Sequence, residues 1–448
     1  MNATYTDITQ YTFYSFMEPT LACVVLYGLG AVWDAVVGVI LYVFRHACLD
    51  LEETVEVSFV DTERNRAIAR AMDRRGTWRR FAPSPWAVTS RAQTAFAGLS
   101  RRRSKYSRDE HVPTLDGVRL LLEWRDGPDT PEDAPLIVCL YGVAGSGESK
   151  VAVDLTDAAF ARGWRSVVYN RRGHGRSLLL PAAPEMLGGC PGTCEHLGTF
   201  KSFPMHADME DMRAVVRHVR RAFPAAPMVL VGFSVGSNAV VKYLGESGKS
   251  GEASPFVGGV SVCNGMDLVK LTKSFTPIGN AFMTGAMRPL ALAKRPEIDR
   301  LAASDARGVA TIDWATVETT VSARDFETAL MLPIYGHRFE TLDDYLLANS
   351  CHLDLKDVAV PLLCMSALDD PLICRDIPLL ALRASLTNPN VFHLATERGG
   401  HLGWLTGWRG SSWMMEVLLQ FVETLVEPDV TRKGPDTVRA TTRCQKDS

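Results

Sequence analysis

The sequence has little excess charge and few cysteines. Its 48 Lys and Arg nearly balance 51 Asp and Glu, so the net charge of -3 does not suggest a nucleic-acid-binding protein. Ten cysteines scattered over 448 residues are too sparse for a disulfide scaffold. The closest pair, Cys190 and Cys194, has His196 nearby but no second ligand pair, so we predict no metal site. Internal repeats are absent, and 46% hydrophobic residues exclude wholesale disorder.

One long hydrophobic run is present near the N-terminus. Residues 21–44 contain a single charged residue, Asp34. A helix of this length would be about 36 Å long, enough to cross a bilayer core. No Lys or Arg precedes the run, which argues against a signal peptide. We therefore predict a single-pass membrane anchor within an N-terminal segment 1–49, with a buried or interfacial helix as the alternative.

Positive charge is concentrated directly after this run. Thirteen Lys and Arg stand against one acid, Asp73, between Arg64 and Arg108. The positive-inside rule then predicts a membrane localisation with the body on the cytoplasmic side, at the endoplasmic reticulum or another endomembrane. We interpret residues 50–110 as a basic linker, or collar. Its interleaved aromatic residues suit a membrane surface, and equally a solvated helix and loop.

The next segment, 111–427, alternates short apolar runs with amphipathic ones. Strands are predicted at 117–124, 135–142, 165–170, 227–234, 256–264, 361–368 and 391–397. Helices are predicted near 150–162, 209–219, 237–244 and 413–426. This alternation indicates an α/β fold with a mostly parallel sheet covered on both faces. Residues 265–350 lack strand patterns and are predicted to be a helical cap insertion, and 428–448 a disordered tail.

The sharpest motif is G-x-S-x-G at 232–236. An apolar strand runs into Ser234, and a helical pattern follows it. This strand–turn–helix context predicts a nucleophile elbow, in which the serine hydroxyl stands at the top of the sheet. The strand and the helix approach each other closely in such a turn, so small residues are needed at Gly232 and Gly236.

A nucleophilic serine needs a histidine base and an acid that orients the histidine. In a fold with this order of strands and helices, the acid follows the serine along the chain and the histidine follows the acid. His393 and His401 lie beyond every candidate acid, but His393 sits inside a strand pattern. We therefore predict His401 as the base. The loop after strand 361–368 supplies Asp370 as the acid, with its neighbour Asp369 as the alternative.

The oxyanion hole is predicted from the backbone N–H groups of Val143 and Val235. The glycines at 142–147 resemble a phosphate loop, but Glu148 replaces its lysine and would repel phosphate. His206 and Asp211 have the H-x-x-x-x-D spacing of some acyltransferases. We interpret them instead as the start of a helix, where acidic residues suit the helix dipole.

Several motifs in order resemble one family. They are NRRGHGRS, MHADMEDMRAVVRHV, GFSVGSN with VKYLGESG, SARDFE, ALDDP and ERGGHLGW. The chain is similar to the alpha/beta-hydrolase fold, and within it to the membrane-anchored group with the plant EMB8-like proteins and the mammalian abhydrolase-domain 1 and 3 proteins. The family triad falls on Ser234, Asp370 and His401. Tyr141 departs from the histidine that many relatives carry in the oxyanion loop.

The resemblance implies a membrane-associated serine hydrolase of carboxylic esters, with lipid esters such as acylglycerols or phospholipids as substrates and no cofactor. Apolar residues of the insertion are candidates for a cap over an acyl chain: Phe275, Phe282, Met283, Met287, Leu290 and Leu292. Two other functions stay open: acyl transfer to a lipid alcohol, and a catalytically silent, membrane-bound interaction module. Protein partners and oligomeric state are not predicted.

Overall fold

The computed structural model describes residues 27–39, 52–99, 105–114, 116–177, 206–304 and 311–427. Their centre is a nine-stranded sheet with the strand order β2-β11-β10-β9-β8-β6-β7-β5-β4. Its strands are β2 (Glu56–Ser58), β4 (Arg108–Pro113), β5 (Arg119–Arg125), β6 (Leu136–Leu140), β7 (Arg165–Tyr169), β8 (Met228–Phe233), β9 (Phe256–Val262), β10 (Leu362–Ala367) and β11 (Val391–Thr396). The six strands from β11 to β7 pair in parallel, and antiparallel strands flank them. The predicted mostly parallel α/β sheet is confirmed.

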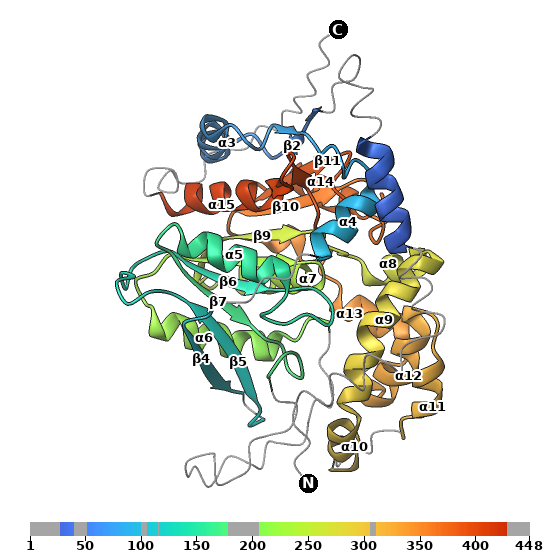
Figure 1. The fold of residues 1–448 in the computed structure, drawn as a ribbon. Helices are drawn as coiled ribbons and strands as arrows, with labels where there is room; N and C mark the ends of the chain where they lie inside the picture. Colours follow the sequence, from blue (N-terminus) through green and yellow to red (C-terminus); the bar gives the residue numbers. More distant parts are fainter. Residues whose placement is uncertain are drawn as a thin grey trace.

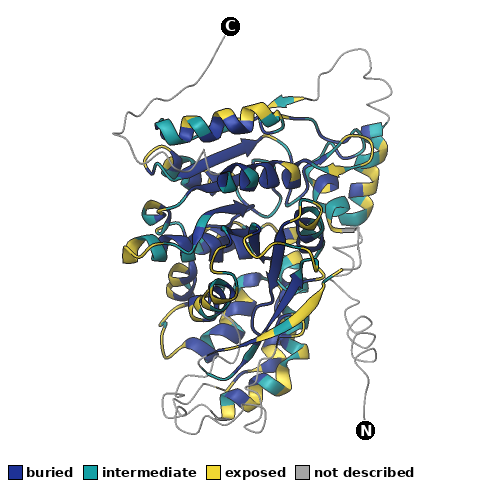
Figure 2. Ribbon diagram, turned by 90° about the vertical axis from the view of Figure 1, so that its left-hand side faces the viewer, coloured by how far each residue is buried: buried dark blue, intermediate teal, exposed yellow. Residues whose placement is uncertain are grey.

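Helices cover both faces of the sheet (Figure 1). On one face lie α3 (Glu63–Arg75), α5 (Lys150–Phe160) and α15 (Trp413–Val426). On the other lie α6 (Met209–Ala222), α7 (Val235–Ser250) and α14 (Pro378–Ser385). The central strands are buried along their whole length (Figure 2), which explains their continuous apolar runs in place of alternation.

A helical cap stands between β9 and β10. It consists of α8 (Leu268–Ser274), α9 (Pro277–Ala293), α10 (Arg295–Ser304), α11 (Trp314–Thr319), α12 (Ala323–Tyr335) and α13 (Leu342–Asn349). Side-chain oxygens of Thr276, Ser322 and Thr341 cap the N-termini of α9, α12 and α13. The cap helices pack on one side of the body in Figure 1 and share its hydrophobic core.

The predicted N-terminal membrane helix is not found. Within the described residues, no helix is both long enough and apolar enough to cross a bilayer. The described part of the run is a helix over residues 27–39. Asp34, the single charge in the run, accepts a hydrogen bond from Thr89 at 2.9 Å and lies 3.8 Å from Arg91. Asp34 therefore faces the rest of the protein.

The segment predicted as a basic collar is largely folded onto the body. Strand β2 pairs with β11, and α3 packs against α15. The helix α4 (Ser90–Leu99) lies beside the C-terminal loops. Short elements complete the chain: β1 (Glu53–Thr54), β3 (Arg80–Phe81), η3 (Leu355–Asp357), β12 (Leu405–Thr406) and β13 (Ser411–Ser412). The domain boundaries at 49, 110 and 427 stay predictions, and the predicted tail lies outside the described residues.

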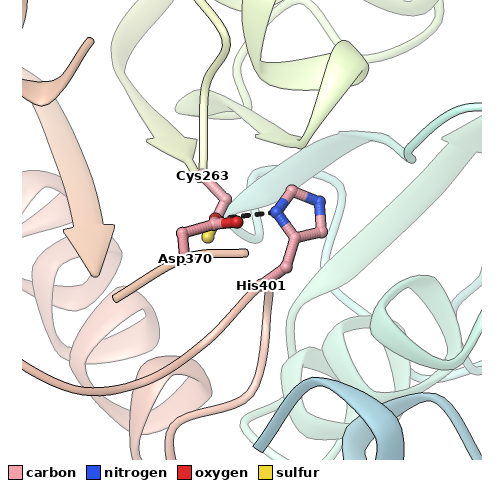
Figure 3. Close-up of side chains that lie close together, drawn as sticks. All are labelled: Cys263, Asp370 and His401. Carbon is pink, nitrogen blue, oxygen red and sulfur yellow. Dashed lines mark hydrogen bonds and ion pairs between the residues drawn. The ribbon is translucent and has the colours of Figure 1, made fainter. Parts of the chain in front are cut away.

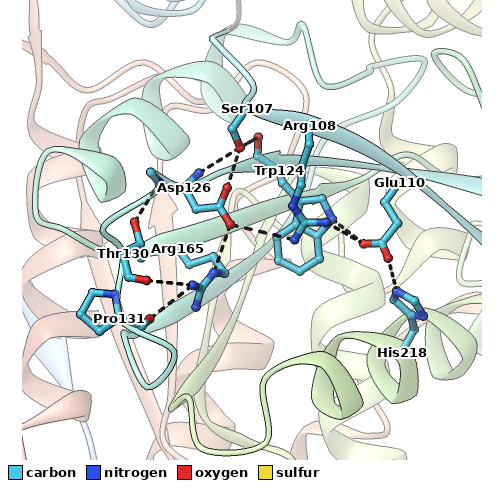
Figure 4. Close-up of polar contacts among 10 residues, drawn as sticks. Ser107, Arg108, Glu110, Trp124, Asp126, Thr130, Pro131, Arg165 and His218 are labelled. Carbon is cyan, nitrogen blue, oxygen red and sulfur yellow. Dashed lines mark hydrogen bonds and ion pairs between the residues drawn. The ribbon is translucent and has the colours of Figure 1, made fainter.

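A polar network holds the edge hairpin β4–β5 against the body (Figure 4). Glu110 of β4 pairs with His218 of α6 at 2.8 Å and accepts a hydrogen bond from Trp124 of β5. Asp126, just after β5, accepts a hydrogen bond from Arg165 of β7 at 3.2 Å. The edge of the sheet is thus tied to α6 and to its neighbouring strand.

Candidate active site

Ser234 occupies a strained turn between β8 and α7. Its backbone has φ 53° and ψ -122°, in the left-handed region that costs a non-glycine residue free energy. A Cβ on Gly232 would lie 2.5 Å from the carbonyl oxygen of Gly236. One on Gly236 would lie 2.6 Å from the carbonyl oxygen of Leu140. Glycine is therefore required at both positions, as expected for an elbow, and the loop after β6 is brought against the serine.

Three side chains that are far apart in the sequence form a hydrogen-bonded chain. His401 Nε2 lies 3.0 Å from Ser234 Oγ, and His401 Nδ1 lies 2.7 Å from Asp370 Oδ2. Figure 3 shows the bond from Asp370 to the imidazole, with Asp370 after β10 and His401 after β11. Both side chains are almost completely buried. The geometry brings the three predicted site residues together.

The two neighbouring aspartates make different contacts. Oδ1 of Asp370 accepts hydrogen bonds from the backbone N–H groups of Leu372 and Ile373, which hold the carboxylate toward His401. Asp369 Oδ1 accepts one from the N–H of Gly400 at 2.9 Å and makes no contact with the imidazole. Burial and the charge of Asp370 raise the pKa of Asp369 to about 6, against the lowering effect of the Gly400 hydrogen bond.

The loop that carries His401 is held from behind by α4. The His401 N–H donates a hydrogen bond to Thr94 Oγ1 at 2.9 Å, and the Leu405 N–H donates one to Gln93 Oε1 at 2.6 Å. Gly400 has φ +60°, and a Cβ there would lie 2.6 Å from the Ser90 carbonyl oxygen. The sequence analysis missed Thr94 and Gln93, because single polar residues on an amphipathic helix carry no spacing signal.

The predicted oxyanion-hole residues lie beside Ser234. Val235 is the first residue of α7, and Val143 follows β6. A Cβ built on Gly142 would lie 3.3 Å from the Ser234 Cβ, so the Val143 loop runs along the nucleophile. In the part of the chain that the structure describes, neither the Val143 N–H nor the Val235 N–H donates a hydrogen bond.

A mostly apolar cavity opens at Ser234 and His401. Its lining includes Val143, Val235, Leu268, Leu271, Phe275, Met283, Leu346, Leu372 and Ile373. Of the predicted cap residues, Phe275 and Met283 line this cavity, while Met287 and Leu290 line a second one. Phe282 is exposed instead, and Leu292 packs on the core.

Cys263 lies beside the acid–histidine pair (Figure 3), a neighbour that the sequence analysis did not identify. One possible ligand atom each from Cys263, Asp370 and His401 lies within 4.8 Å of the others. Both His401 nitrogens already make hydrogen bonds, so an ion would have to displace Asp370 or Ser234. Burial and the charge of Asp370 raise the pKa of the Cys263 thiol well above its usual value. A protonated thiol is a poor metal ligand.

The remaining sequence candidates lie elsewhere. His393 lies in β11, where burial lowers its pKa to about 4. Asp208 caps the N-terminus of α6, and Asp211 binds Arg172 in an ion pair, as the helix-start interpretation expects. His206 bonds Glu327 of α12. Cys190 and Cys194 lie outside the described residues.

The parallel sheet and the strained serine between β8 and α7 define an α/β hydrolase. The family model described as alpha/beta hydrolase fold matches residues 135–407, and the chain belongs to this family. Phospholipase ABHD3 of Mus musculus is 28% identical over 361 residues, which cover 78% of this chain and 79% of that protein.

Two further relatives are similar over most of the chain. The embryogenesis-associated protein EMB8 of Picea glauca is 29% identical, covering 78% of this chain and 73% of its own. Monoacylglycerol lipase ABHD2 of Mus musculus is 24% identical, covering 89% and 93%. The predicted resemblance is confirmed, and an ester hydrolase is the enzyme class that the family and these relatives support.

Proposed function

We propose that the protein is a serine hydrolase that cleaves carboxylic esters of lipids through an acyl-enzyme intermediate. The observation that carries this proposal is the hydrogen-bonded chain from Asp370 through His401 to Ser234, with Ser234 on a strained elbow. The apolar cavity at Ser234 fits an acyl chain. Similarity to proteins named phospholipase and monoacylglycerol lipase favours lipid esters over other esters.

The mechanism follows from the positions of the atoms. His401 Nε2 takes the Ser234 proton as Oγ attacks the ester carbonyl, while Asp370 stabilises the resulting imidazolium at Nδ1. The N–H groups of Val143 and Val235 bind the developing oxyanion. The protonated His401 gives its proton to the leaving alcohol. The same histidine then activates water, which releases the fatty acid from Ser234.

A fluorophosphonate probe tests the nucleophile, because it reacts with activated serines. We expect it to label the full-length wild-type chain and not Ser234→Ala, whose ester hydrolysis should fall by about 10⁶-fold. Ser250→Ala at the exposed end of α7 is the matched control and should label normally. Ester hydrolysis retained by a folded Ser234→Ala would disprove the proposal. Absence of labelling in folded wild type would favour the silent interaction module.

We also propose that helix 27–39 attaches the protein to a lipid surface. Leu29, Val32, Trp33 and Val36 follow the i, i+3, i+4, i+7 spacing of one helix face. All four are exposed, Trp33 by 68%, while Asp34 on the other side contacts Thr89. An apolar face turned outward from a docked helix suits the acyl boundary of a membrane. In Figure 1 this dark blue helix lies on the same side of the molecule as α8 and α9.

Vesicle binding tests the attachment. Trp33→Glu combined with Val36→Glu should abolish co-sedimentation with phosphatidylcholine vesicles, because charged side chains do not enter the acyl region. Leu386→Glu, an exposed position just beyond α14, is the control and should bind as wild type does. Neutral vesicles remove any contribution from the basic collar. Equal binding by the double variant and the wild type would refute the role of this face.

A further inference from the structure

A buried arginine without a carboxylate partner stands next to the candidate active site. Arg171 follows β7 and is 8% exposed. Its Nη2 donates a hydrogen bond to His174 Nε2 at 3.1 Å, and its Nε has no partner. Among the described residues, no carboxylate lies within ion-pair distance of this guanidinium. The charge of Asp208 acts on it from beyond contact distance. A buried cation that no carboxylate contacts is unfavourable, so a role for its charge is expected.

The neighbouring residue Arg172 lies in the same loop and has a structural role. Arg172 is also buried, but its guanidinium makes ion pairs with Asp116 at 2.6 Å and with Asp211 at 2.8 Å. These bonds use its donors to tie the loop to α6 and to the turn before β5. Arg171 makes no such link, and packing alone would not require a charged side chain at its position.

Arg171 and His174 line the second cavity, together with Val143 and Ala144 of the predicted oxyanion loop. Val143, His206 and Glu327 line both this cavity and the one at Ser234. The two spaces therefore adjoin at the oxyanion loop. A substrate whose ester carbonyl lies at Ser234 would extend its next group toward Arg171.

The surroundings hold the guanidinium in place as a cation. Burial and the charge of Arg171 lower the pKa of His174 to about 3, so its ring stays neutral. His174 Nδ1 donates a hydrogen bond to the Arg172 carbonyl oxygen at 3.0 Å, which leaves the Nε2 lone pair for Arg171. Glu327 also lines the cavity, but its Oε1 pairs with His206 at 2.8 Å. An arginine remains protonated even when burial lowers its pKa.

We propose that Arg171 forms a subsite for an anionic group of the ester substrate, a phosphate or a carboxylate, beside the oxyanion loop. The inference rests on the proposed ester hydrolysis at Ser234. Guanidinium groups bind such oxygens through paired N–H donors, and the Nε–H of Arg171 makes no hydrogen bond within the described residues. Arg171 is then a specificity-determining residue, and His174 positions it. The preferred substrates are lipid esters that carry negative charge close to the ester bond.

Three esters with the same acyl chain test the subsite: a monoacylglycerol, its 3-phosphate, and the matching acylglycerate. The full-length chain in detergent should show a kcat/KM for one of the anionic esters about 10- to 100-fold above that for the neutral ester, the size of a charge-assisted hydrogen bond. The anionic ester that is preferred identifies phosphate or carboxylate as the ligand. Most of the difference should appear in KM.

Arg171→Met should reduce this preference to near unity, and Arg171→Lys should keep part of it. Arg295→Met, which removes an exposed cap cation from α10, is the matched control and should leave the preference as in wild type. His174→Phe should reduce the preference in the same direction as Arg171→Met. An unchanged preference in Arg171→Met would overturn the proposal.

Two outcomes separate this inference from the proposed function. Wild type that hydrolyses all three esters equally would overturn the subsite and leave the hydrolase in place. Wild type that hydrolyses none and takes up no fluorophosphonate would overturn the hydrolase itself. Should Arg171→Met fail to fold, inhibition of wild type is decisive: glycerol 3-phosphate or glycerate should compete with the neutral ester, and glycerol should not. Equal, weak inhibition by all three would refute the subsite.

Discussion

Asp369 and Asp370 follow the same strand, β10, yet only one of them faces the imidazole. Asp370 is fixed by two backbone N–H groups and lies 2.7 Å from His401 Nδ1. Asp369 accepts a hydrogen bond from the Gly400 N–H, and this bond helps to hold the loop that carries His401. Side chains one residue apart point in different directions on such a turn, and the fold assigns each of them a different partner.

The two aspartates should therefore respond differently to the same substitution. Asp370→Asn should lower kcat by about 10⁴-fold, the effect of the equivalent change in a serine protease. Asp369→Asn should keep most of the activity, because the amide oxygen can still accept from the Gly400 N–H. Kinetics of both variants with one ester measure this. Loss of activity in Asp369→Asn alone would reverse the assignment.

Asp369 also predicts a pH dependence of stability. Its pKa is raised to about 6 in the folded state from the ordinary 3.8. The folded state then binds more protons than the unfolded chain between these values, so the contribution of Asp369 to stability falls as the pH rises through this window. Asp369→Asn should match wild type near pH 4 and exceed its unfolding free energy by about 2 kcal/mol above pH 7. Urea unfolding of wild type and Asp369→Asn at both pH values measures this. The same difference in unfolding free energy at pH 4 and above pH 7 would contradict the prediction.

At the scale of elements, α4 connects the N-terminal part of the chain to the histidine loop. Thr94 accepts the hydrogen bond of the His401 N–H, and Gln93 bonds Leu405 and Ala87. Helix 27–39 lies on α4 in turn, through Asp34 and Thr89. A segment outside the parallel sheet thus sets the position of the predicted base.

Thr94→Val tests this support. The change leaves the buried N–H of His401 without an acceptor, so we expect a loss of about 1 kcal/mol in unfolding free energy and about a tenfold fall in kcat, with KM little changed. The Thr94 hydroxyl also donates a hydrogen bond to the Ser90 carbonyl oxygen, four residues earlier. Thr319→Val on α11 removes the same kind of bond at an exposed position and serves as the control. Activity equal to wild type in Thr94→Val would mean that α4 does not position the histidine.

At the scale of the whole molecule, a buried arginine with two ion pairs joins parts of the chain that lie far apart in the sequence. The Arg172 side chain is 1% exposed and bridges Asp116 and Asp211, which lie far apart in the sequence. It thereby fixes the loop that carries Arg171 and His174 against α6. That loop supplies Arg171 and His174 to the lining of the second cavity.

Removal of Arg172 should be strongly destabilising. Arg172→Met would remove the guanidinium that pairs with the buried Asp211 and the half-buried Asp116, and we expect a loss of about 3 to 5 kcal/mol in unfolding free energy. The exposed pair of Arg66 with Asp61 is the comparison, since Arg66→Met should cost less than about 1 kcal/mol. Denaturant unfolding of the two variants measures this difference. Similar losses of unfolding free energy in both would show that the buried ion pairs stabilise the fold no more than an exposed pair does.

The sequence by itself determined the features that depend on local pattern. The apolar runs predicted the central strands because strands buried on both faces need no alternation. The glycines around Ser234 predicted the elbow, since only they allow the contact between β8, α7 and the loop after β6. The order of elements selected Asp370 and His401, although it could not separate Asp370 from Asp369.

Only the tertiary structure decided what depends on contacts between distant segments. The hydrophobic run at 21–44 indicated a membrane span, but the contact of Asp34 with Thr89 becomes visible only when the helix is docked. The support of His401 by Thr94 and the cavity beside Arg171 join residues with no common spacing. Long-range packing sets such contacts, and no periodicity along the chain records them.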